Sequence, residues 1–356
     1  MNFGHHKQQS HQNLRCPECG ADLSDSSPGT PCSACLLKLG MQTWQAGAGN
    51  PTMQPTTAPD GSPSFQPVIE PDLAKKFPHL EILHLVARGG MGDVYCARQT
   101  SLDRLVALKI IRPDVQSALG FADRFVREAQ ALAKLSHQNI VTVYDFGQTD
   151  GVYYFIMEYI DGINLRQMLR SGKLGPRQAL EIVPAVCDAL QFAHDKGIVH
   201  RDIKPDNILM DGFGDVKLCD LGLIFQNGMK DFGEDFLAGS PHYLSPEEIQ
   251  GVTVDTRSDI FSLGASLFHL ISGELPYKGE TIREILFARI EQPPPNLIDF
   301  NPAVKPALAK AIMQMMEPDI NYRFQSGQEC IEALENSERT TLILRRPNTN
   351  QNYNNQ

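Results

Sequence analysis

A short polar stretch of the sequence combines the residue types that moving a phosphoryl group requires. His200-Arg201-Asp202 is followed by Lys204 and Asn207, and the triplet 220–222 (Asp-Leu-Gly) begins thirteen residues after Asn207. Apolar, strand-like runs flank these residues, so we expect them on short loops. One carboxylate can orient an attacking hydroxyl group, while a second carboxylate and an amide can hold Mg²⁺ against nucleotide phosphates. The alternative is a polar turn between two strands that has this spacing by chance.

A glycine-rich segment, Arg88–Val94, lies between two predicted strands and contains Gly89, Gly90 and Gly92. Glycine lets backbone N–H groups approach phosphates without a side chain in the way. Such a segment is as often only a turn. The strand Val106-Ala107-Leu108-Lys109 follows it, and taken alone Lys109 could equally be a solvated surface lysine.

A carboxylate on the predicted helix 119–135 favours a binding role for that lysine. The face that carries Glu128 also carries four apolar residues: Phe121, Phe125, Leu132 and Leu135. Glu128 therefore projects from the apolar stripe toward the core. A buried carboxylate needs a cationic partner. Lys109 is the expected partner, and the pair would direct its ammonium group at the α- and β-phosphates of a nucleotide.

Four of the eight cysteines have the spacing of a metal site. Cys16, Cys19, Cys32 and Cys35 form two C-x₂-C pairs twelve residues apart. Two such pairs can complete a tetrahedral thiolate shell for structural Zn²⁺, although two disulfides or free thiols are the alternatives. Because some thirty residues cannot build a core, we expect this module to fold only with metal. The other cysteines stand singly among apolar residues and are expected to be inert: Cys96, Cys187, Cys219 and Cys330.

Composition describes a globular chain that carries a net charge of −10, with 42% hydrophobic and 21% charged residues. This charge argues against a surface that coats nucleic acid. The cysteine-rich module also has few cations, so a protein partner is more plausible for it than DNA or RNA. We find no apolar run long enough for a membrane span and no secretion signal at the start, which together predict a cytoplasmic protein.

Periodicity divides the ordered part into a β-rich and a helical half, an α+β architecture. The expected antiparallel strands are 80–87, 93–99, 104–111, 141–147 and 152–159, and the expected helices are 119–135, 176–195 and 256–272. The last helix is apolar nearly all round and should be a buried axis. Pro184 inside the helix 176–195 is a departure that costs about 3 kcal/mol unless a kink accommodates it.

Together these residues resemble the protein kinase superfamily, and in particular the eukaryotic-like serine/threonine kinases of bacteria. The resemblance spans about 80–335. It implies a bilobal kinase fold over 77–336, with a small N-lobe at about 77–160, a larger helical C-lobe at about 161–336, and ATP between them. We expect a disordered lead-in at 1–14, a four-cysteine module similar to a zinc ribbon at 15–40, a flexible linker at 41–76, and a disordered Asn/Gln-rich tail at 337–356.

The resemblance also assigns roles to single residues. Asp202 would be the catalytic base, Lys204 would steady the transferred group, and Lys109 with Glu128 would hold phosphates. Mg²⁺ would be bound by Asn207 and Asp220. The ATP-binding residues would be Ala87, Gly89, Gly90, Gly92, Val94, Ala107, Lys109, the gatekeeper Met157, and the backbones of Glu158 and Ile160. Structural roles fall to a Glu247–Arg323 pair, to Asp259 as a brace for the catalytic loop, and to Arg201.

The implied activity is that of a non-specific serine/threonine protein kinase, which uses ATP and Mg²⁺ to phosphorylate protein hydroxyl groups. The alternative is a pseudokinase or signalling scaffold that binds partners through the zinc module. The sequence departs from the family pattern at Ala87, where glycine is usual, and at Leu221, where phenylalanine is usual. A third departure concerns regulation, because 221–239 contains no Ser, Thr or Tyr.

This third departure suggests that acidic side chains replace a regulatory phosphate. Asp231, Glu234 and Asp235 would pair with Arg201 and support activity without phosphorylation of the loop. A merely solvated acidic loop is the alternative, and Ser240 and Tyr243 remain candidate phosphorylation sites.

Overall fold

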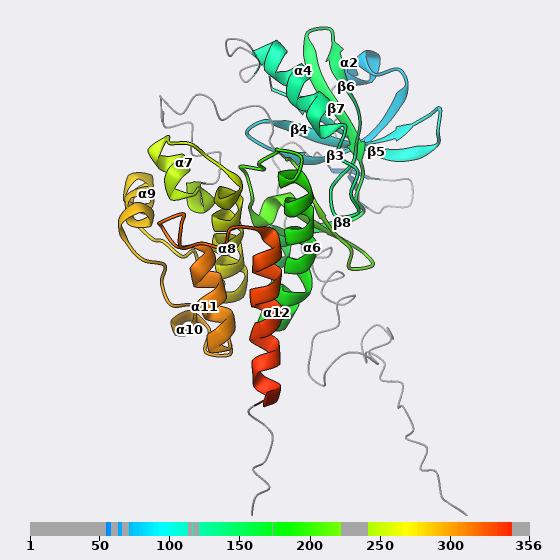
Figure 1. Ribbon diagram of the computed structural model, residues 1–356. Helices are drawn as coiled ribbons and strands as arrows, with labels where there is room; N and C mark the ends of the chain where they lie inside the picture. The colour runs from blue at the N-terminus through cyan, green and yellow to red at the C-terminus, as the bar shows by residue number, and fades with distance from the viewer. Residues whose placement is uncertain are drawn as a thin grey trace, which may run out of the picture.

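The computed structural model describes residues 55–57, 63–65, 71–112, 116, 121–172, 174–221 and 241–343. The zinc module at 15–40, the lead-in before it and the acidic residues of 231–235 lie outside these ranges. Figure 1 shows two lobes, a β-sheet with α4 against it above a larger bundle of helices. The α+β, bilobal architecture expected from the sequence is confirmed for the described residues.

The N-lobe is built on a five-stranded antiparallel sheet in the order β3-β4-β5-β7-β6. Its strands are β3 (Leu80–Arg88), β4 (Gly92–Gln99), β5 (Arg104–Ile111), β6 (Val143–Thr149) and β7 (Val152–Glu158). Alternation along β5 sends Val106 and Leu108 into one apolar cluster and Ala107 into another. Lys109 shares the face of Ala107, because residues two apart point to the same side of a strand.

Helices cover both faces of this sheet. On one face, α4 (Phe121–Leu132) buries four residues: Phe121, Phe125, Ala129 and Leu132. On the other face, α2 (Pro71–Lys76) places Leu73 in a cluster with Phe77 and Val106. The sequence analysis assigned 41–76 wholly to a flexible linker, and this was wrong for α2. Leu73 and Phe77 are four residues apart, so both reach the sheet from one side of a helical turn.

The predicted linker also contains a short pair of antiparallel strands, β1 (Pro55–Thr57) and β2 (Pro63–Phe65). Its composition, rich in proline and poor in charge, did not indicate them. Isolated three-residue strands have no periodicity long enough to detect in a sequence.

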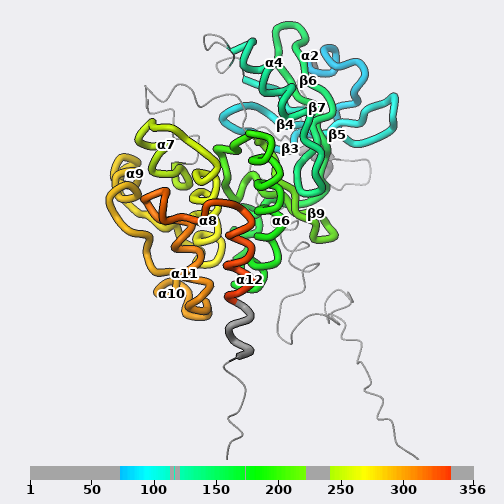
Figure 2. The backbone as a smooth tube through the Cα atoms, viewed as in Figure 1, coloured from blue at the N-terminus to red at the C-terminus, as the bar shows by residue number. Residues whose placement is uncertain are grey.

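The C-lobe is organised around α8. Its helices are α5 (Leu165–Ser171), α6 (Pro176–His194), α7 (Pro246–Gln250), α8 (Thr256–Ser272), α9 (Ile282–Glu291), α10 (Leu297–Phe300), α11 (Pro306–Met315) and α12 (Gly327–Ile343). Fifteen of the seventeen residues of α8 are buried, as the sequence predicted for an axial helix. α6 and α11 lie beside α8 (Figure 2). The side chain of Asp255 caps the start of α8, and Gly273 ends it at φ +80°.

A three-stranded sheet under the N-lobe carries the polar loops. It runs β10-β9-β8, with β8 (Gly162–Asn164), β9 (Ile208–Asp211) and β10 (Val216–Leu218). A 3₁₀ turn, η1 (Pro205–Asn207), leads into β9, and a second turn, η3 (Pro241–Tyr243), precedes α7. The backbone of Leu218 bonds Val141 and Asn139, at 2.9 and 2.8 Å, and so ties β10 to the chain entering β6.

Two helices test the sequence predictions. α6 runs through Pro184 without a break, from Pro176 to His194, in agreement with the predicted helix 176–195. α12 continues to Ile343, past the boundary set at 337, because Ser337 is buried and its hydroxyl group donates to the carbonyl of Leu334 at 2.6 Å. No helix in the described ranges combines the length and apolar character needed to cross a membrane.

Candidate active site

The loop that contains Asp202 is held by a buried carboxylate from α8. Asp259 accepts the backbone N–H groups of His200 and Arg201, both at 2.8 Å, and contacts the His194 ring at 2.7 Å. Arg201 has φ +65°, an unfavourable conformation for a residue with a side chain. The bonds to Asp259 therefore hold a strained turn in place, and the bracing contact expected of Asp259 is present.

Two side chains converge on the carboxylate of Asp202. Lys204 Nζ contacts Oδ1 at 2.9 Å and Oδ2 at 2.7 Å. Asn207 Nδ2 donates to Oδ2 at 2.9 Å and to the backbone carbonyl of Asp202 at 2.8 Å. The Asp202 side chain keeps 26% of its surface exposed. The carboxylate is therefore fixed in direction and still reachable by a substrate hydroxyl group.

The second carboxylate, Asp220, pairs with the lysine of the N-lobe. Lys109 Nζ lies 2.7 Å from Asp220 Oδ1, and Lys109 is buried. Burial alone would raise the pKa of Asp220, but the ammonium groups of Lys109 and Lys204 outweigh it and hold this pKa below its ordinary value. Asp220 is therefore an anion at neutral pH.

A neutral histidine links the two carboxylate loops. The His200 ring is 3.0 Å from the carbonyl of Cys219 through Nε2, and its Nδ1 accepts the N–H of Asp202 at 3.2 Å. Burial lowers the pKa of His200 and raises that of the Cys219 thiol well above its ordinary value. Both groups are uncharged at neutral pH, so they connect the loops without competing for a cation.

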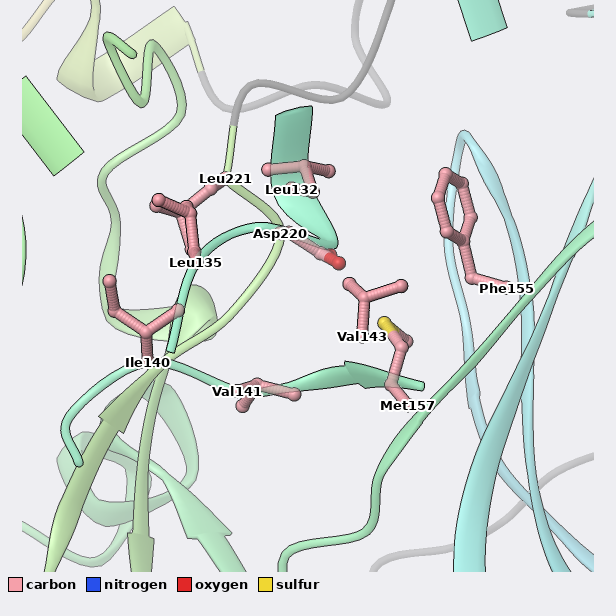
Figure 3. Close-up of a pocket in the computed structure, with 9 residues that line it drawn as sticks. All are labelled: Leu132, Leu135, Ile140, Val141, Val143, Phe155, Met157, Asp220 and Leu221. Carbon is pink, nitrogen blue, oxygen red and sulfur yellow. The ribbon is translucent and has the colours of Figure 1, made fainter. Parts of the chain in front are cut away.

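Asp220 also borders an apolar pocket beneath the sheet. Figure 3 shows its carboxylate directed toward Val143. The remaining lining residues are Leu132, Leu135, Ile140, Val141, Phe155, Met157 and Leu221. Met157, the expected gatekeeper, lies opposite Ala107 where β7 pairs with β5. Ala107 is buried and is one of the residues that the sequence analysis assigned to ATP binding.

The strand end at Glu158 is held by its own side chain. Glu158 Oε1 and Oε2 lie 2.9 and 3.0 Å from Lys217 Nζ, and the Glu158 N–H donates to the carbonyl of Thr142 at 2.9 Å. These contacts fix the backbone of Glu158, which stays a predicted contact of ATP. Ile160 follows it and packs against the main core.

The glycine-rich segment is a tight hairpin between β3 and β4. Gly89 and Gly92 exchange backbone hydrogen bonds at 2.9 and 3.3 Å, and Ala87 pairs with Val94. A Cβ atom on Gly92 would lie 1.9 Å from the carbonyl oxygen of Ile110. Only glycine fits at this position. Gly89 and Gly90 are exposed at the tip of the hairpin, where the N–H of Gly89 already donates to the carbonyl of Gly92.

Glu128 is half-buried on the face of α4 that also carries Phe121 and Phe125. Lys109 forms its ion pair with Asp220, and a Lys109–Glu128 pair stays a prediction. The sequence analysis did not foresee the contact with Asp220, because it joins residues 111 positions apart.

The expected pair of Glu247 and Arg323 is present and buried. Arg323 Nη1 and Nη2 bond the two carboxylate oxygens of Glu247 at 2.7 and 2.8 Å, in the bidentate arrangement that suits a guanidinium. Burial raises the pKa of Glu247, but the bonds from Arg323 outweigh this and leave it below its ordinary value.

Sequence reasoning missed Arg289 and the Lys217–Glu158 pair. Arg289 stands among alternating charged and apolar residues of α9, where its spacing resembles that of a surface arginine. Lys217 lies on a strand of mixed polarity. No signal in a single sequence distinguishes either side chain from a solvated one.

The two-lobed fold and the paired carboxylate loops define the class of protein, a protein kinase domain. Residues 80–334 match the family model described as protein kinase domain, and the chain belongs to the protein kinase family.

The chain is similar to named bacterial kinases. It is 38% identical over 251 residues to serine/threonine-protein kinase PrkC of Bacillus subtilis, covering 70% of this chain and 39% of PrkC. It is 36% identical over 259 residues to serine/threonine-protein kinase PknB of Mycolicibacterium smegmatis, covering 70% and 41%. The chain thus matches about two fifths of the length of these relatives.

Solved structures of the same family are also similar. The PknI kinase domain of Mycobacterium tuberculosis superposes with a TM-score of 0.60 at 28% identity, over 73% of this chain and 96% of that domain.

Proposed function

We propose that the chain is an ATP-dependent serine/threonine protein kinase, which transfers the γ-phosphoryl group of ATP to hydroxyl groups of proteins. The observation that carries this proposal is the convergence of Lys204 and Asn207 on the carboxylate of Asp202. A fixed, accessible carboxylate suits a base that accepts the proton of a substrate hydroxyl group. Lys204, in contact with it, can steady the charge of the transferred group.

The donor groups near Asp202 fit a magnesium ion. Mg²⁺ prefers oxygen ligands, and Asp220 supplies an ionised carboxylate. Asn207 uses Nδ2 for its bonds to Asp202, so its amide oxygen is left for a metal. When bound, Mg²⁺ would neutralise charge on the β- and γ-phosphates. Lys109 lies at Asp220 and can extend to the phosphates, with Glu128 as the residue proposed to hold it.

The remaining ATP-binding roles follow the positions of the side chains and backbone groups. Ala87, Gly89, Gly90 and Gly92 would cover the phosphates. Val94, Ala107 and Met157 would enclose the base, and the backbones of Glu158 and Ile160 would bond it. The burial of Ala107 and Met157 supports an apolar base-binding slot.

The test is the transfer of labelled phosphate from ATP to casein and to the chain itself. We expect Asp202→Asn to lower transfer by about 100-fold or more, the usual contribution of a catalytic base. Asp195→Asn, an exposed aspartate at the end of α6, is the matched control and should retain activity. Binding of a fluorescent ATP analogue verifies that both variants keep the nucleotide site. A wild-type chain that binds nucleotide but transfers no phosphate would instead be a scaffold.

We further propose that Cys16, Cys19, Cys32 and Cys35 bind a structural zinc ion, and that the module at 15–40 contacts a protein partner. Two C-x₂-C pairs support the zinc site, and the lack of Lys and Arg between Cys16 and Cys35 supports a protein partner. The module would then select or locate substrates for the kinase domain, which itself would need a Ser- or Thr-bearing protein, ATP and Mg²⁺.

A further inference from the structure

A lysine of β10 is bonded to the strand end that is proposed to meet the base of ATP. Lys217 Nζ contacts both carboxylate oxygens of Glu158, at 2.9 and 3.0 Å, and Glu158 Oε2 also accepts the N–H of Thr142 at 3.2 Å. The side chains of Lys217 and Glu158 keep only 19% and 24% of their surface exposed. Because the pair is largely shielded from water and uses both oxygens, it can fix the position of β10 relative to the end of β7.

The strand that carries Lys217 leads to both residues proposed to bind Mg²⁺. Asp220 follows the last residue of β10 by two positions. Asn207 comes just before β9, which pairs with β10, and its backbone carbonyl accepts the N–H of Cys219 at 3.0 Å. Backbone bonds therefore connect the strand of Lys217 to the two proposed metal ligands.

The other hydrogen bonds between β10 and the N-lobe reach a different strand. The backbone of Leu218 bonds Asn139 and Val141, where the chain enters β6. Among the hydrogen bonds and ion pairs of the described residues, only the contact of Lys217 with Glu158 joins β10 to β7. The end of β7 is the part of the N-lobe whose backbone is proposed to bond the base. This one side chain thus connects the base end of the cleft to the metal end.

We propose that Lys217 is a positioning residue for the nucleotide: through Glu158 it sets the separation between the backbone that meets the base and the carboxylate of Asp220. The inference rests on the proposed kinase function. ATP has to reach both places at once, since one ribose joins its base to its metal-bound phosphates. A ligand that spans two places binds well only when their separation matches its own length. A ligand confined to one end of the cleft has no such requirement.

The experiment uses the full chain and compares the binding of three ligands by calorimetry: adenosine, magnesium tripolyphosphate and Mg·ATP. Adenosine would occupy the base end alone, and tripolyphosphate the metal end alone. We expect Lys217→Met to raise the dissociation constant and the KM of Mg·ATP about fivefold, while the dissociation constants of both fragments and the KM for casein stay within about twofold. Lys217→Arg keeps a cation that can bond both oxygens and should restore most of the affinity for Mg·ATP.

Two further variants identify the contact that is responsible. If Lys217 acts through Glu158, the double variant of Lys217→Met with Glu158→Gln should bind Mg·ATP no more weakly than Lys217→Met alone. Lys278→Met is the matched control, because it removes an exposed Lys–Glu pair, with Glu274, between α8 and α9. It should change none of the constants.

The inference is overturned if both fragments weaken in Lys217→Met as much as Mg·ATP does, because the lysine would then be a general support of the cleft. Unchanged or tighter binding of Mg·ATP overturns it as well. If circular dichroism shows that Lys217→Met does not fold, Glu158→Gln decides, because it keeps an acceptor for the N–H of Thr142. The same difference between Mg·ATP and the fragments is expected there, and its absence overturns the inference.

The proposed function fails in a different way. A wild-type chain that binds Mg·ATP but phosphorylates no protein would refute the kinase activity, while the comparison of the three ligands would still decide the role of Lys217. A wild-type chain that does not bind Mg·ATP would refute both.

Discussion

Each of the two carboxylates of the candidate active site, Asp202 and Asp220, pairs with a different lysine. Lys204 holds Asp202 and Lys109 holds Asp220, with shortest contacts of 2.7 Å in both pairs. Two anions close together would repel each other, and the paired cations reduce this repulsion before any metal or nucleotide arrives. If Asp220 holds Mg²⁺ as proposed, its carboxylate is already ionised and oriented by Lys109 before the metal binds.

Ala87 is the residue at which the glycine-rich hairpin, proposed to cover the phosphates of ATP, departs from the family pattern. Its methyl group is exposed on β3 opposite Val94 and restricts the backbone just before the glycines. We expect Ala87→Gly to lower KM for ATP severalfold and to leave kcat within about twofold, because a looser hairpin adapts to the phosphates without entering the chemical step. Initial rates over a range of ATP concentrations check this.

Ala133→Gly, in the exposed turn after α4, is the control for the general effect of an added glycine. A large rise of kcat in Ala87→Gly would contradict the expectation, since it would place Ala87 in the transition state rather than in ATP binding.

Residue pairs were predictable only where a family pattern supplied them. The contacts of Glu247 with Arg323 and of Asp259 with the catalytic loop were expected from the resemblance and are present. The pairing of Lys109 with Asp220 and the burial of Arg289 were not, because both depend on which distant segments meet. Charge and spacing within one helix or strand carry no such information.

At the scale of elements, the short helix α7 is fixed by a buried acidic cap. Ser245 and Glu248 form a capping box: the Glu248 carboxylate accepts the N–H and the hydroxyl group of Ser245, both at 2.8 Å. Glu248 is buried, and its other oxygen has no partner among the described residues. Burial, reinforced by the negative charges of Asp259 and Glu247, outweighs the bonds from Ser245 and raises the pKa of Glu248 to about 7.

A carboxyl group whose pKa is raised on folding makes the protein less stable as pH rises. The contribution of Glu248 to the free energy of unfolding should be greatest below the ordinary pKa of 4.5, fall between 4.5 and about 7, and then level off. The shift corresponds to at most about 3 kcal/mol. Glu248→Gln keeps an acceptor for Ser245 and has no charge, so we expect it to be more stable than wild type at pH 8 and equal to it near pH 4.5.

Urea unfolding at both pH values measures this difference, with Glu291→Gln at the exposed end of α9 as the control. If Glu248→Gln and wild type are equally stable at pH 8, then ionising Glu248 in the folded protein costs little free energy, which would contradict the expectation.

Long helices with a sustained apolar pattern were predictable from the sequence nearly to the residue. The predicted 256–272 coincides with α8, and 176–195 differs from α6 by one residue. Short elements were not: α2 has six residues and the strands β1 and β2 have three each. Their stability comes from packing against the sheet or from pairing with each other, which a local pattern of a few residues cannot express.

At the scale of the whole molecule, hydrogen bonds and an ion pair join the two lobes close to the candidate active site. β10 bonds the chain at Asn139 and Val141, and Lys217 of β10 bonds Glu158 at the end of β7. β10 leads directly to Asp220. A movement of the N-lobe would therefore also move Asp220, the carboxylate proposed to hold Mg²⁺. The hydrogen bonds to Asp259 keep Asp202 fixed to the C-lobe.

The zinc module proposed for the N-terminal cysteines would be a second unit with its own chemistry. Four thiolates in two C-x₂-C pairs suit the tetrahedral preference of zinc, and a module of this size would gain its folding free energy from the metal. We expect the purified chain to contain about one zinc ion, and Cys16→Ser with Cys19→Ser to abolish it, because two thiolates cannot close the shell. Elemental analysis measures the metal, and Cys96→Ala is the control, since Cys96 is buried singly in the sheet.

The same variant shows whether the module acts on the cleft or only on partners. Because Asp202, Lys204, Asn207 and their supports all lie within the kinase domain, loss of zinc should leave casein phosphorylation within about twofold of wild type. A chain with four reactive thiols and no zinc would refute the metal site. A double variant that loses both zinc and casein phosphorylation would show instead that the module is needed for a working active site.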